Sequence, residues 1–454
     1  MHLHILGIGG TFMGGLALIA RSAGHRVTGC DQAIYPPMST QLAEQGIDLI
    51  EGFGADQLKL EPDLFIVGNV VSRGNELMEA ILNANAPYTS GPQWLGEHVL
   101  TTQHVLAVAG THGKTTTSAM LAWILQQCGL KPNFLIGGIA PGLGVSAKFD
   151  SESSLFVIEA DEYDTAFFDK RSKFVHYRAR TAILNNLEYD HADIFDSLDD
   201  IETQFHHLVR TVASSGQILA TDGELAIERV LQRGCWTPVT WLGRPDGWHG
   251  QAQDGQIQIA LGQKTIGALQ WSLSGEHNIK NALAALAGAH AVGVPPEQAL
   301  LALNGFSGVK RRMETLAVIN DITIYDDFAH HPSAIQTTLA GLRQRAGQAR
   351  ILAVLEPRSN TMKLGAMATR LPDALAPADF TFCYAGGHGK QALQWDPSEA
   401  LARLAPNLQI AHEVDALVDS VLNMALPGDH IVIMSNGGFE GFHTKLVDAM
   451  RAKP

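Results

Sequence analysis

The chain has 454 residues, of which 46% are hydrophobic and 17% are charged, and its formal net charge is −14 at pH 7. These values are typical of a soluble globular protein, and the length predicts about three domains. The negative charge excludes a nucleic-acid partner held by bulk electrostatics, although it allows a local basic pocket for phosphates. We find no apolar run long enough for a membrane span and no signal peptide. The four cysteines (Cys30, Cys128, Cys235, Cys383) form no C-x-x-C pair, so we expect a cytoplasmic protein without structural zinc or disulfides.

The first expected domain, residues 1–100, is Rossmann-like. Apolar strands are predicted at 2–8, 26–30 and 64–67, a helix runs to about residue 23, and turn residues at 91–92 mark the domain's end. Residues 7–14 (GIGGTFMG) join the first strand to the helix, as in a dinucleotide-binding turn, and Asp31 follows the second strand. Phe12 stands where that motif has glycine or alanine. We therefore interpret the turn as a diphosphate site, with a turn that binds no ligand as the alternative.

The second expected domain, residues 101–305, contains a phosphate loop. An apolar strand at 105–109 leads into residues 110–116 (GTHGKTT), and a helical pattern follows at 118–127. Backbone N–H groups of such a loop face nucleotide phosphates, Lys114 supplies a charge to the β and γ oxygens, and Thr115 offers a hydroxyl to Mg²⁺. The usual first glycine is replaced by Val108, so the loop is a variant.

Polar groups follow the neighbouring strands of this domain. Four carboxylates within 159–164 (EADEYD) come after the strand at 155–159, and they would repel one another unless cations lie nearby. Residues 185–191 (NNLEYDH) follow the strand at 181–184, and His191 could ligate a metal. A solvated acidic loop and a surface histidine are the alternatives. The pattern of 257–273 predicts an antiparallel hairpin packed on the parallel sheet, and a helix follows at 279–292.

Three further segments carry polar groups suited to nucleotide or carboxylate binding. Asn278 and Asn281 share a helix face and could bind a base, although capping of the helix would also explain the asparagine near its start. Residues 310–314 (KRRME) are either a solvated charge run or the source of an arginine for a transferring phosphoryl group. In the third expected domain, residues 306–454, parallel strands are predicted at 323–325, 351–355, 380–384 and 430–434. The guanidinium of Arg358 follows one of them and suits a substrate carboxylate.

Taken in order, these segments resemble the Mur ligases, the ATP-dependent amide-forming family of cell-wall precursor synthesis. The resemblance covers nearly the whole chain. It rests on residues 110–116, 159–162, 186–191, 275–278 with Asn281, Arg311-Arg312 and 326–331. It implies an α/β fold of three domains: N-terminal Rossmann-like, central P-loop ATPase-like with a small antiparallel addition, and C-terminal Rossmann-like with the incoming peptide.

Within the family, the chain resembles members that accept UDP-N-acetylmuramate. The segments 9–14, 35–39, 167–173, 355–361 and 435–439 are similar to members that attach the recycled tripeptide L-alanyl-γ-D-glutamyl-meso-diaminopimelate. Addition of L-alanine is the alternative. A P-loop kinase or switch NTPase, and a nicotinamide oxidoreductase, leave more of the motifs unexplained. The resemblance implies ATP and Mg²⁺, with Mn²⁺ as a substitute, and no nucleic-acid partner. The sequence leaves the choice between a monomer and a weak dimer open.

The resemblance also implies roles for single residues. Lys114, Glu159, His191 and Arg312 are expected to be catalytic. ATP binding is expected at Gly110, Thr111, His112, Gly113, Lys114, Thr115, Thr116, His277, Asn278, Asn281 and Asp327. The UDP-sugar is expected at Gly7, Gly9, Gly10, Thr11, Phe12, Met13 and Asp31, and the peptide at Arg358, Ser359 and Asn360. Expected metal ligands are Thr115, Glu159, His191 and His207, where His207 replaces the carbamylated lysine of other members.

Overall fold

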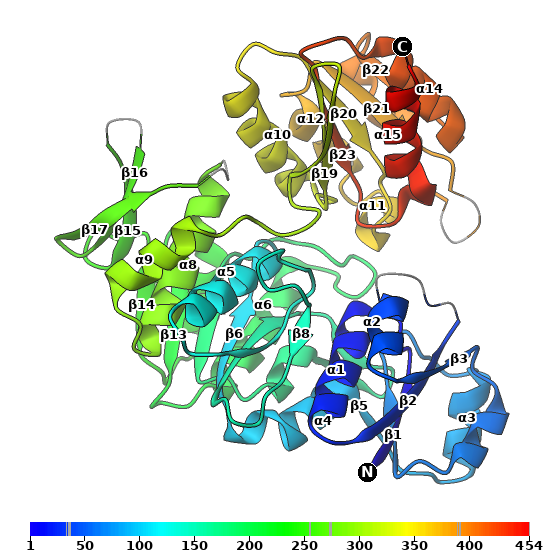
Figure 1. Cartoon of the computed structure of the whole chain (residues 1–454), viewed down its shortest axis with the longest axis vertical. Coiled ribbons are helices and arrows are strands. Elements are labelled where there is room, and N and C mark those ends of the chain that lie inside the picture. Colours follow the sequence, from blue (N-terminus) through cyan, green and yellow to red (C-terminus); the bar gives the residue numbers. More distant parts are fainter. Residues whose placement is uncertain are drawn as a thin grey trace. The chain divides into compact units, whose positions relative to one another are not determined.

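The computed structural model describes residues 1–454 except 33, 35–37, 254–255, 272–274, 388, 390–391 and 454. Part of the 35–39 motif and the end of the expected 257–273 segment therefore lie outside the described residues. The chain forms two compact units (Figure 1). The first comprises Met1–Glu188, Leu198–Trp271 and Ile279–Ser307, and the second comprises Tyr189–Ser197, Ser272–Asn278 and Gly308–Pro454. Across the described residues, no helix is long and apolar enough to cross a membrane.

The N-terminal domain is built on a five-stranded sheet in the order β3-β2-β1-β4-β5, and every pair in it is parallel. Its strands are β1 (His2–Leu6), β2 (Arg26–Asp31), β3 (Asp48–Glu51), β4 (Leu64–Val67) and β5 (Tyr88–Ser90). Its helices are α1 (Thr11–Ser22), α2 (Met38–Glu44), α3 (Glu76–Asn83) and α4 (Gly91–His98). The expected Rossmann-like sheet is confirmed. The turn expected at 91–92 is wrong, because Ser90 caps a helix there and Pro92 occupies its first turn.

Helix α1 connects this sheet to the central one. Its residues from Met13 to Ala20 are all buried, so the helix is covered on more than one side. Gly15 allows the close approach, because a Cβ there would lie 2.4 Å from the side chain of Leu135 and 3.2 Å from that of Ala147. Those residues belong to the last two strands at one side of the central sheet, and the strand that contains Ala147 forms its edge. The glycine turn before α1 is thereby held beside the central sheet.

The central sheet has seven strands in the order β14-β13-β12-β6-β9-β7-β8. They are β6 (His104–Ala109), β7 (Asn133–Leu135), β8 (Ala147–Lys148), β9 (Leu155–Ala160), β12 (Thr181–Leu184), β13 (Gln217–Thr221) and β14 (Val239–Leu242). Its helices are α5 (Lys114–Gln127), α6 (Leu198–Thr211), α7 (Leu225–Gln232), α8 (Glu276–Ala291) and α9 (Pro296–Asn304). The sheet is parallel except for the pairing of β8 with β7. Because β6 lies between β9 and β12 in register, the loops after these three strands meet at one edge.

Two small antiparallel elements belong to the same unit. Strands β10 (Asp164–Ala166) and β11 (Asp169–Ser172) form a hairpin that the sequence analysis did not predict. Strands β15 (Trp248–Gln253), β16 (Gln256–Leu261) and β17 (Lys264–Leu269) form a separate sheet. The predicted hairpin is confirmed as β16–β17. Strand β17 packs on α9, and β15 of the same small sheet contacts β14 of the parallel sheet.

The C-terminal sheet has six strands in the order β18-β19-β23-β20-β21-β22, parallel except for β18–β19. They are β18 (Glu314–Ile319), β19 (Ile322–Asp327), β20 (Ile351–Leu355), β21 (Phe380–Tyr384), β22 (Leu408–Ala411) and β23 (His430–Met434). Helices α14 (Val414–Met424) and α15 (Phe442–Ala452) cover one face. Helices α10 (Pro332–Ala346) and α12 (Leu371–Leu375) cover the other, so the sheet is doubly wound as predicted. The domain limits at 100 and 305 stay predictions.

Candidate active site

The phosphate loop follows β6 and ends at Gly113, the residue before α5. Gly113 has a φ of 82°, in the left-handed region, and a Cβ there would lie 2.4 Å from Oδ1 of Asn281. Glycine is required on both counts. Helix α5 begins at Lys114, four residues before the predicted start, with no side-chain cap and no acidic residue in its first turn. Its N-terminal N–H groups therefore form an anion site of the kind expected for phosphates.

Three asparagines fix the loop, and only one of them was predicted to be functional. The Asn186 amide accepts from the backbone N–H of His112 at 2.8 Å and donates to its carbonyl at 3.1 Å. Asn185 Nδ2 donates to the Thr117 hydroxyl at 3.0 Å, and that hydroxyl donates to Asn281 Oδ1 at 3.1 Å. Asn281 is buried, and this bond holds the first turn of α5. Contact of Asn281 with adenine stays a prediction.

Lys114 lies among carboxylates. Its Nζ donates to Glu162 at 2.9 Å and to the carbonyl of Gly110 at 2.7 Å, and it lies 3.8 Å from Asp161. Burial works to lower the pKa of Lys114, but the Glu162 and Asp161 carboxylates outweigh it and raise that pKa. Lys114 is therefore an ammonium ion at the position predicted for the γ-phosphate contact.

Glu159 and Thr115 form a pair beside this lysine. The Thr115 hydroxyl donates to one Glu159 oxygen at 2.8 Å, and the backbone N–H of Gly137 donates to the other at 2.7 Å. Burial and the like charge of Asp161 raise the pKa of Glu159. A hydroxyl and a carboxylate within hydrogen-bonding distance at the start of α5 are suitable oxygen donors for Mg²⁺, so the residues present fit the predicted metal.

The predicted sugar-nucleotide turn lines a cavity of about 210 Å³. Five of the seven predicted residues line it: Gly7, Gly10, Thr11, Phe12 and Met13. The other two form a clamp beneath the turn, because the N–H of Gly9 donates to Asp31 at 2.9 Å. The cavity is completed by residues that sequence reasoning did not assign to it: Asn69, Val70, Pro92, Tyr163, Thr165 and Lys173.

In the second unit, His191 follows a buried carboxylate. Asp190 accepts from the His191 N–H at 2.7 Å and from the Thr361 hydroxyl at 2.8 Å. Burial works to raise the pKa of Asp190, but the imidazoles of His191, His330 and His331 lower it to about 2. The backbone of His191 has a φ of 54°, in the left-handed region. A metal-ligand role for His191 stays a prediction.

The two adjacent arginines have different surroundings. Arg311 donates to Asp326 at 3.1 Å and to the carbonyls of Ser435 and Gly437 at 2.8 Å, so its role is structural. The Arg312 guanidinium lies 5.1 Å from the centre of the Phe328 ring. Burial and the charge of Arg312 lower the pKa of His277 to about 4, so this imidazole is neutral near pH 7. The expected phosphoryl contact of Arg312 stays a prediction.

Asp327 and the residues predicted to bind the peptide mostly contact other residues of the second unit. Asp327 is buried and accepts from the N–H groups of Met313 and Ala329, both at 2.8 Å. Ser359 caps the short helix α11 (Asn360–Leu364), and Asn360 donates to Asp193 at 2.7 Å. Arg358 lies 3.6 Å from Glu356 and keeps 41% of its side chain exposed, so it is the predicted peptide residue best placed to receive a carboxylate.

Models of three consecutive domains match this chain. They are the Mur ligase family catalytic domain at residues 2–102, the Mur ligase middle domain at 108–289 and the Mur ligase glutamate ligase domain at 311–437. An Escherichia coli (strain K12) protein is 51% identical over 457 residues, covering 100% of this chain and 99% of the relative. The chain belongs to the Mur ligase family. That relative is named "UDP-N-acetylmuramate--L-alanyl-gamma-D-glutamyl-meso-2,6-diaminoheptandioate ligase".

Two further relatives are named for different ligase activities within the Mur ligase family. The crystal structure of a murein peptide ligase from Psychrobacter arcticus 273-4 is 45% identical, covers 99% of this chain and 98% of its own, and has a TM-score of 0.76. A UDP-N-acetylmuramate--L-alanine ligase from Desulforapulum autotrophicum is 32% identical and covers 78% of this chain and 77% of its own. The chain is thus more similar to the peptide-joining ligases than to this alanine ligase.

The residues expected to cooperate in a Mur ligase are divided between the two units. Lys114, Thr115, Glu159 and His207 belong to the first, whereas His191, His277, Arg312 and Arg358 belong to the second. Burial lowers the pKa of His207, which favours the neutral imidazole needed for a metal ligand. The joint metal site of Glu159, His191 and His207 stays a prediction.

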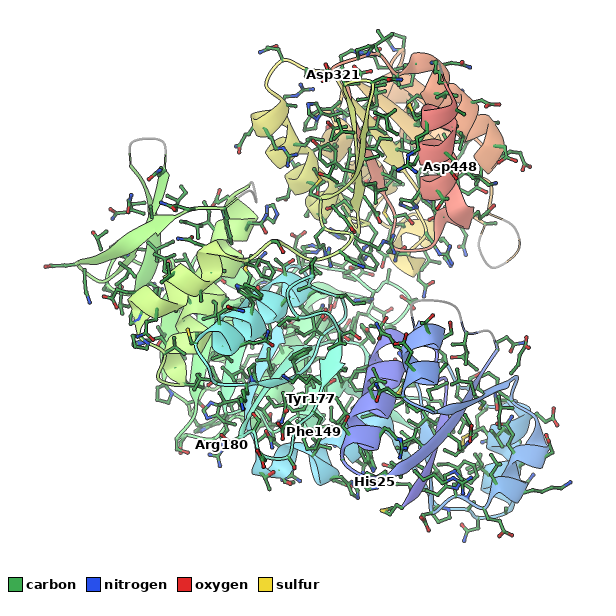
Figure 2. All side chains as sticks on the ribbon, in the orientation of Figure 1. His25, Phe149, Tyr177, Arg180, Asp321 and Asp448 are labelled. Atoms are coloured by element: carbon green, nitrogen blue, oxygen red, sulfur yellow. The ribbon has the colours of Figure 1, made fainter. Side chains whose placement is uncertain are left out.

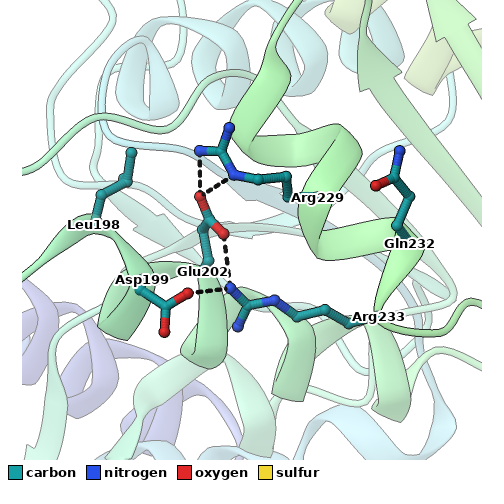
Figure 3. Close-up of a pocket in the computed structure, with 6 residues that line it drawn as sticks. All are labelled: Leu198, Asp199, Glu202, Arg229, Gln232 and Arg233. Carbon is teal, nitrogen blue, oxygen red and sulfur yellow. Dashed lines mark hydrogen bonds and ion pairs between the residues drawn. The ribbon is translucent and has the colours of Figure 1, made fainter.

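A second cavity, between α6 and α7, has a different character (Figure 3). It is about 460 Å³ in volume, and Glu202 is buried at its base. Glu202 accepts from Arg229 Nε at 2.9 Å and from Arg233 at 2.7 Å, and Arg233 also binds Asp199 at 2.6 Å. Two carboxylates neutralise two guanidinium groups, so we interpret this network as a brace between the helices.

Proposed function

We propose that this Mur ligase joins L-alanyl-γ-D-glutamyl-meso-diaminopimelate to the lactyl carboxylate of UDP-N-acetylmuramate, with hydrolysis of ATP to ADP and phosphate. The observation that carries the proposal is the pairing of two nucleotide sites in the first unit. The phosphate loop with Lys114 serves ATP, and the cavity at the glycine turn serves the sugar nucleotide. The full-length similarity to ligases of that name supports the choice of peptide. Such an enzyme recycles peptidoglycan fragments, and we place it in the cytoplasm.

The reaction requires activation of a carboxylate. The lactyl oxygen attacks the γ-phosphorus, the bond to the ADP oxygen breaks, and an acyl phosphate forms. The amino group of the peptide then attacks the acyl carbon, loses a proton, and phosphate leaves as the C–N bond forms. Mg²⁺ held by ATP with Thr115 and Glu159 would supply charge neutralisation when bound. The chain contributes mainly position and electrostatics.

Three of the predicted site residues have a task in this scheme: Lys114, Arg312 and Arg358. Lys114 neutralises the γ-phosphate, because its ammonium is already held charged at the start of α5. The backbone N–H groups of the loop donate hydrogen bonds to the phosphate oxygens. The hydrogen bonds of Asn186 and Asn281 keep those N–H groups in place. Arg312 is proposed to stabilise the charge on the transferring phosphoryl group. Arg358 is proposed to bind a carboxylate of the peptide.

Phosphate release by the purified protein tests the proposal. We expect release with Mg²⁺-ATP, UDP-N-acetylmuramate and the tripeptide together, and only background release when the sugar nucleotide or the peptide is omitted. Mass spectrometry should show the UDP-muramoyl tripeptide. Release with L-alanine but not with the tripeptide would assign the chain to the alanine-adding activity. Release with neither amine would contradict the ligase reaction.

A further inference from the structure

Lys173 is a buried cation that the mechanism above does not use. It follows β11 as the first residue of the 3-10 turn η3 (Lys173–His176), and it is only 4% exposed. Its Nζ lies 4.0 Å from the centre of the Tyr163 ring and 4.9 Å from that of Phe12. Two aromatic faces therefore hold the ammonium in a slot where little water can solvate it.

The carboxylates around Lys173 lie beyond direct hydrogen-bonding distance. Asp161 is 3.6 Å away, which is longer than the roughly 2.7–2.9 Å of a direct charge-assisted hydrogen bond, and Asp164 and Glu159 attract the ammonium from farther away. Asp161 is shared, because it also lies 3.8 Å from Lys114. Burial lowers the pKa of Lys173, the expected response of an ammonium that has lost water. An anionic ligand would relieve that desolvation.

The same ammonium lines the cavity at the glycine turn. Gly10, Thr11 and Phe12 from the start of α1 line that cavity together with Lys173. Helix α1 has 12 residues, no side-chain cap and no acidic residue in its first turn, so its N-terminal N–H groups and positive dipole end are available to an anion. A helix N-terminus and a buried ammonium therefore converge on one space of about 210 Å³.

The position of Lys173 is fixed from both of the domains that form the cavity. The β10–β11 hairpin that precedes it carries Phe167, which packs against the buried apolar cluster of the N-terminal sheet. Next to it, Phe168 contacts the Tyr88 ring edge-to-face at 5.1 Å. On the other side of the slot, the Phe12 ring stacks with Tyr177, which Figure 2 labels, at 6.5 Å. These contacts aim the side chain rather than leave it mobile.

We propose that Lys173 binds the diphosphate of the sugar nucleotide, acting from the central domain opposite the N-terminal N–H groups of α1. This inference rests on the proposed function, because it takes UDP-N-acetylmuramate as the ligand. The lysine supplies a point charge, and the α1 turn supplies directed N–H donors. The site therefore selects nucleoside diphosphates over nucleosides, and it makes binding of the sugar nucleotide depend on contact between the two domains.

Substitution of Lys173 by methionine tests this assignment. Methionine keeps the apolar stem and removes the charge. We expect the Kd of UDP, measured by calorimetry, and the KM of UDP-N-acetylmuramate to rise about 30-fold, as for loss of a charged hydrogen bond. The Kd of uridine and the KM of ATP should change less than about threefold. Lys170→Met is the matched control, because Lys170 is 72% exposed and pairs with Asp164, which does not line the cavity, and it should behave as wild type.

The ratio of UDP to uridine affinity decides the outcome. If Lys173→Met lowers the affinities for UDP and uridine equally, or neither of them, the lysine is a structural cation and the assignment is wrong. Circular dichroism and thermal unfolding establish that the variant folds. If it does not fold, Lys173→Arg replaces it, and this charged variant should keep UDP affinity within about tenfold of wild type with unchanged uridine affinity. Failure of the proposed function is distinguishable, because wild-type protein itself would then bind no UDP-N-acetylmuramate.

Discussion

Two clusters of charged side chains in the first unit differ in how well their opposite charges are matched. Between α6 and α7, Glu202 and Asp199 face Arg229 and Arg233 at hydrogen-bonding distances, and the charges cancel. Beside the phosphate loop, the carboxylates Glu159, Asp161 and Glu162 outnumber the ammonium groups Lys114 and Lys173. Two contacts there, both with Asp161, are ion pairs of 3.6–3.8 Å rather than hydrogen bonds.

The pKa values express the same difference. Burial and a neighbouring carboxylate raise the pKa of Glu159, so its charge is unfavourable where it lies. Excess negative charge of this kind raises the free energy of the site, and a bound metal ion would lower it. The network between α6 and α7 has no such excess, because each of its charges already has a partner. Of two ion clusters, the one with mismatched charges is therefore the candidate for function.

The largest expected effect comes from Lys114→Met. Removing this ammonium should lower kcat/KM for ATP by about a thousandfold, since the γ-phosphate loses its charged partner in a dry site. The free energy of unfolding should also fall, by about 3 kcal/mol, because removal of the ammonium leaves the buried Glu162 carboxylate without its partner, but this is less than the roughly 4 kcal/mol that a thousandfold loss of activity represents. Phosphate release and urea unfolding measure the two quantities. A destabilisation larger than the loss of activity would place this cluster in the same structural class as the network between α6 and α7.

The sequence predicted the phosphate loop itself, but it did not predict the residues that hold the loop in place. The glycines and Lys114 have a recognisable spacing because phosphate binding requires backbone N–H groups in a fixed order. The roles of Asn185 and Asn186 had no such signal, since each acts through a hydrogen bond to a residue more than 65 positions away. The ranges of β4, β12 and β20 were predicted to the residue, because each is a short apolar run bounded by polar or turn residues.

The β10–β11 hairpin shows why the rest could not be predicted. Residues 164–172 (DTAFFDKRS) place two adjacent phenylalanines before a run of charged residues, without the apolar periodicity of a core strand. Its purpose becomes visible only when Phe167 is found against the N-terminal sheet. The role of Lys173, at the end of this segment, has no signal in the sequence beyond a family motif, because its burial depends on Phe12 and Tyr163 from separate parts of the chain.

The neutral polar cluster around His4 tests whether matched hydrogen-bond partners stabilise the fold without any charged group. His4 is fully buried and binds Thr28 at 2.8 Å and Gln57 at 3.0 Å, and burial lowers its pKa to about 4. The unfolded chain takes up a proton near pH 6.5, so this histidine costs stability as the pH falls from 6.5 to 4. The loss should reach about 3 kcal/mol and then level off below pH 4.

His4→Gln isolates this contribution. Glutamine does not titrate, so the variant should lose about 3 kcal/mol less than wild type between pH 7 and pH 4, whatever its stability at pH 7. Urea unfolding at several pH values gives the comparison. If the unfolding free energies of the two proteins fall in parallel with pH, His4 takes up a proton equally well in the folded and unfolded states. Its hydrogen bonds would then not require a neutral imidazole.

Glu202→Gln should break the matched network without affecting catalysis. The amide keeps the shape of Glu202 and removes the charge that two guanidinium groups share. Because those groups retain access to water, the expected loss is about 2 kcal/mol of unfolding free energy, below that of a fully buried pair. Glu224→Gln is the control, since its pairing with Lys280 at 3.3 Å is partly exposed and should contribute less than about 0.5 kcal/mol. A fall in kcat/KM with Glu202→Gln at unchanged stability would contradict a bracing role.

The smallest effect, and the sharpest comparison, concerns Asn281. If its bond to Thr117 positions the loop, Asn281→Ala should lower kcat/KM about tenfold for ATP and by the same factor for GTP, since the phosphates are shared. If its amide instead binds adenine, the loss should be confined to ATP. Thr117→Val separates the two further, because a positioning bond predicts that the double variant is no worse than either single one. Additive losses would assign Asn281 to the base, and would leave the first turn of α5 to be held by Asn185 alone.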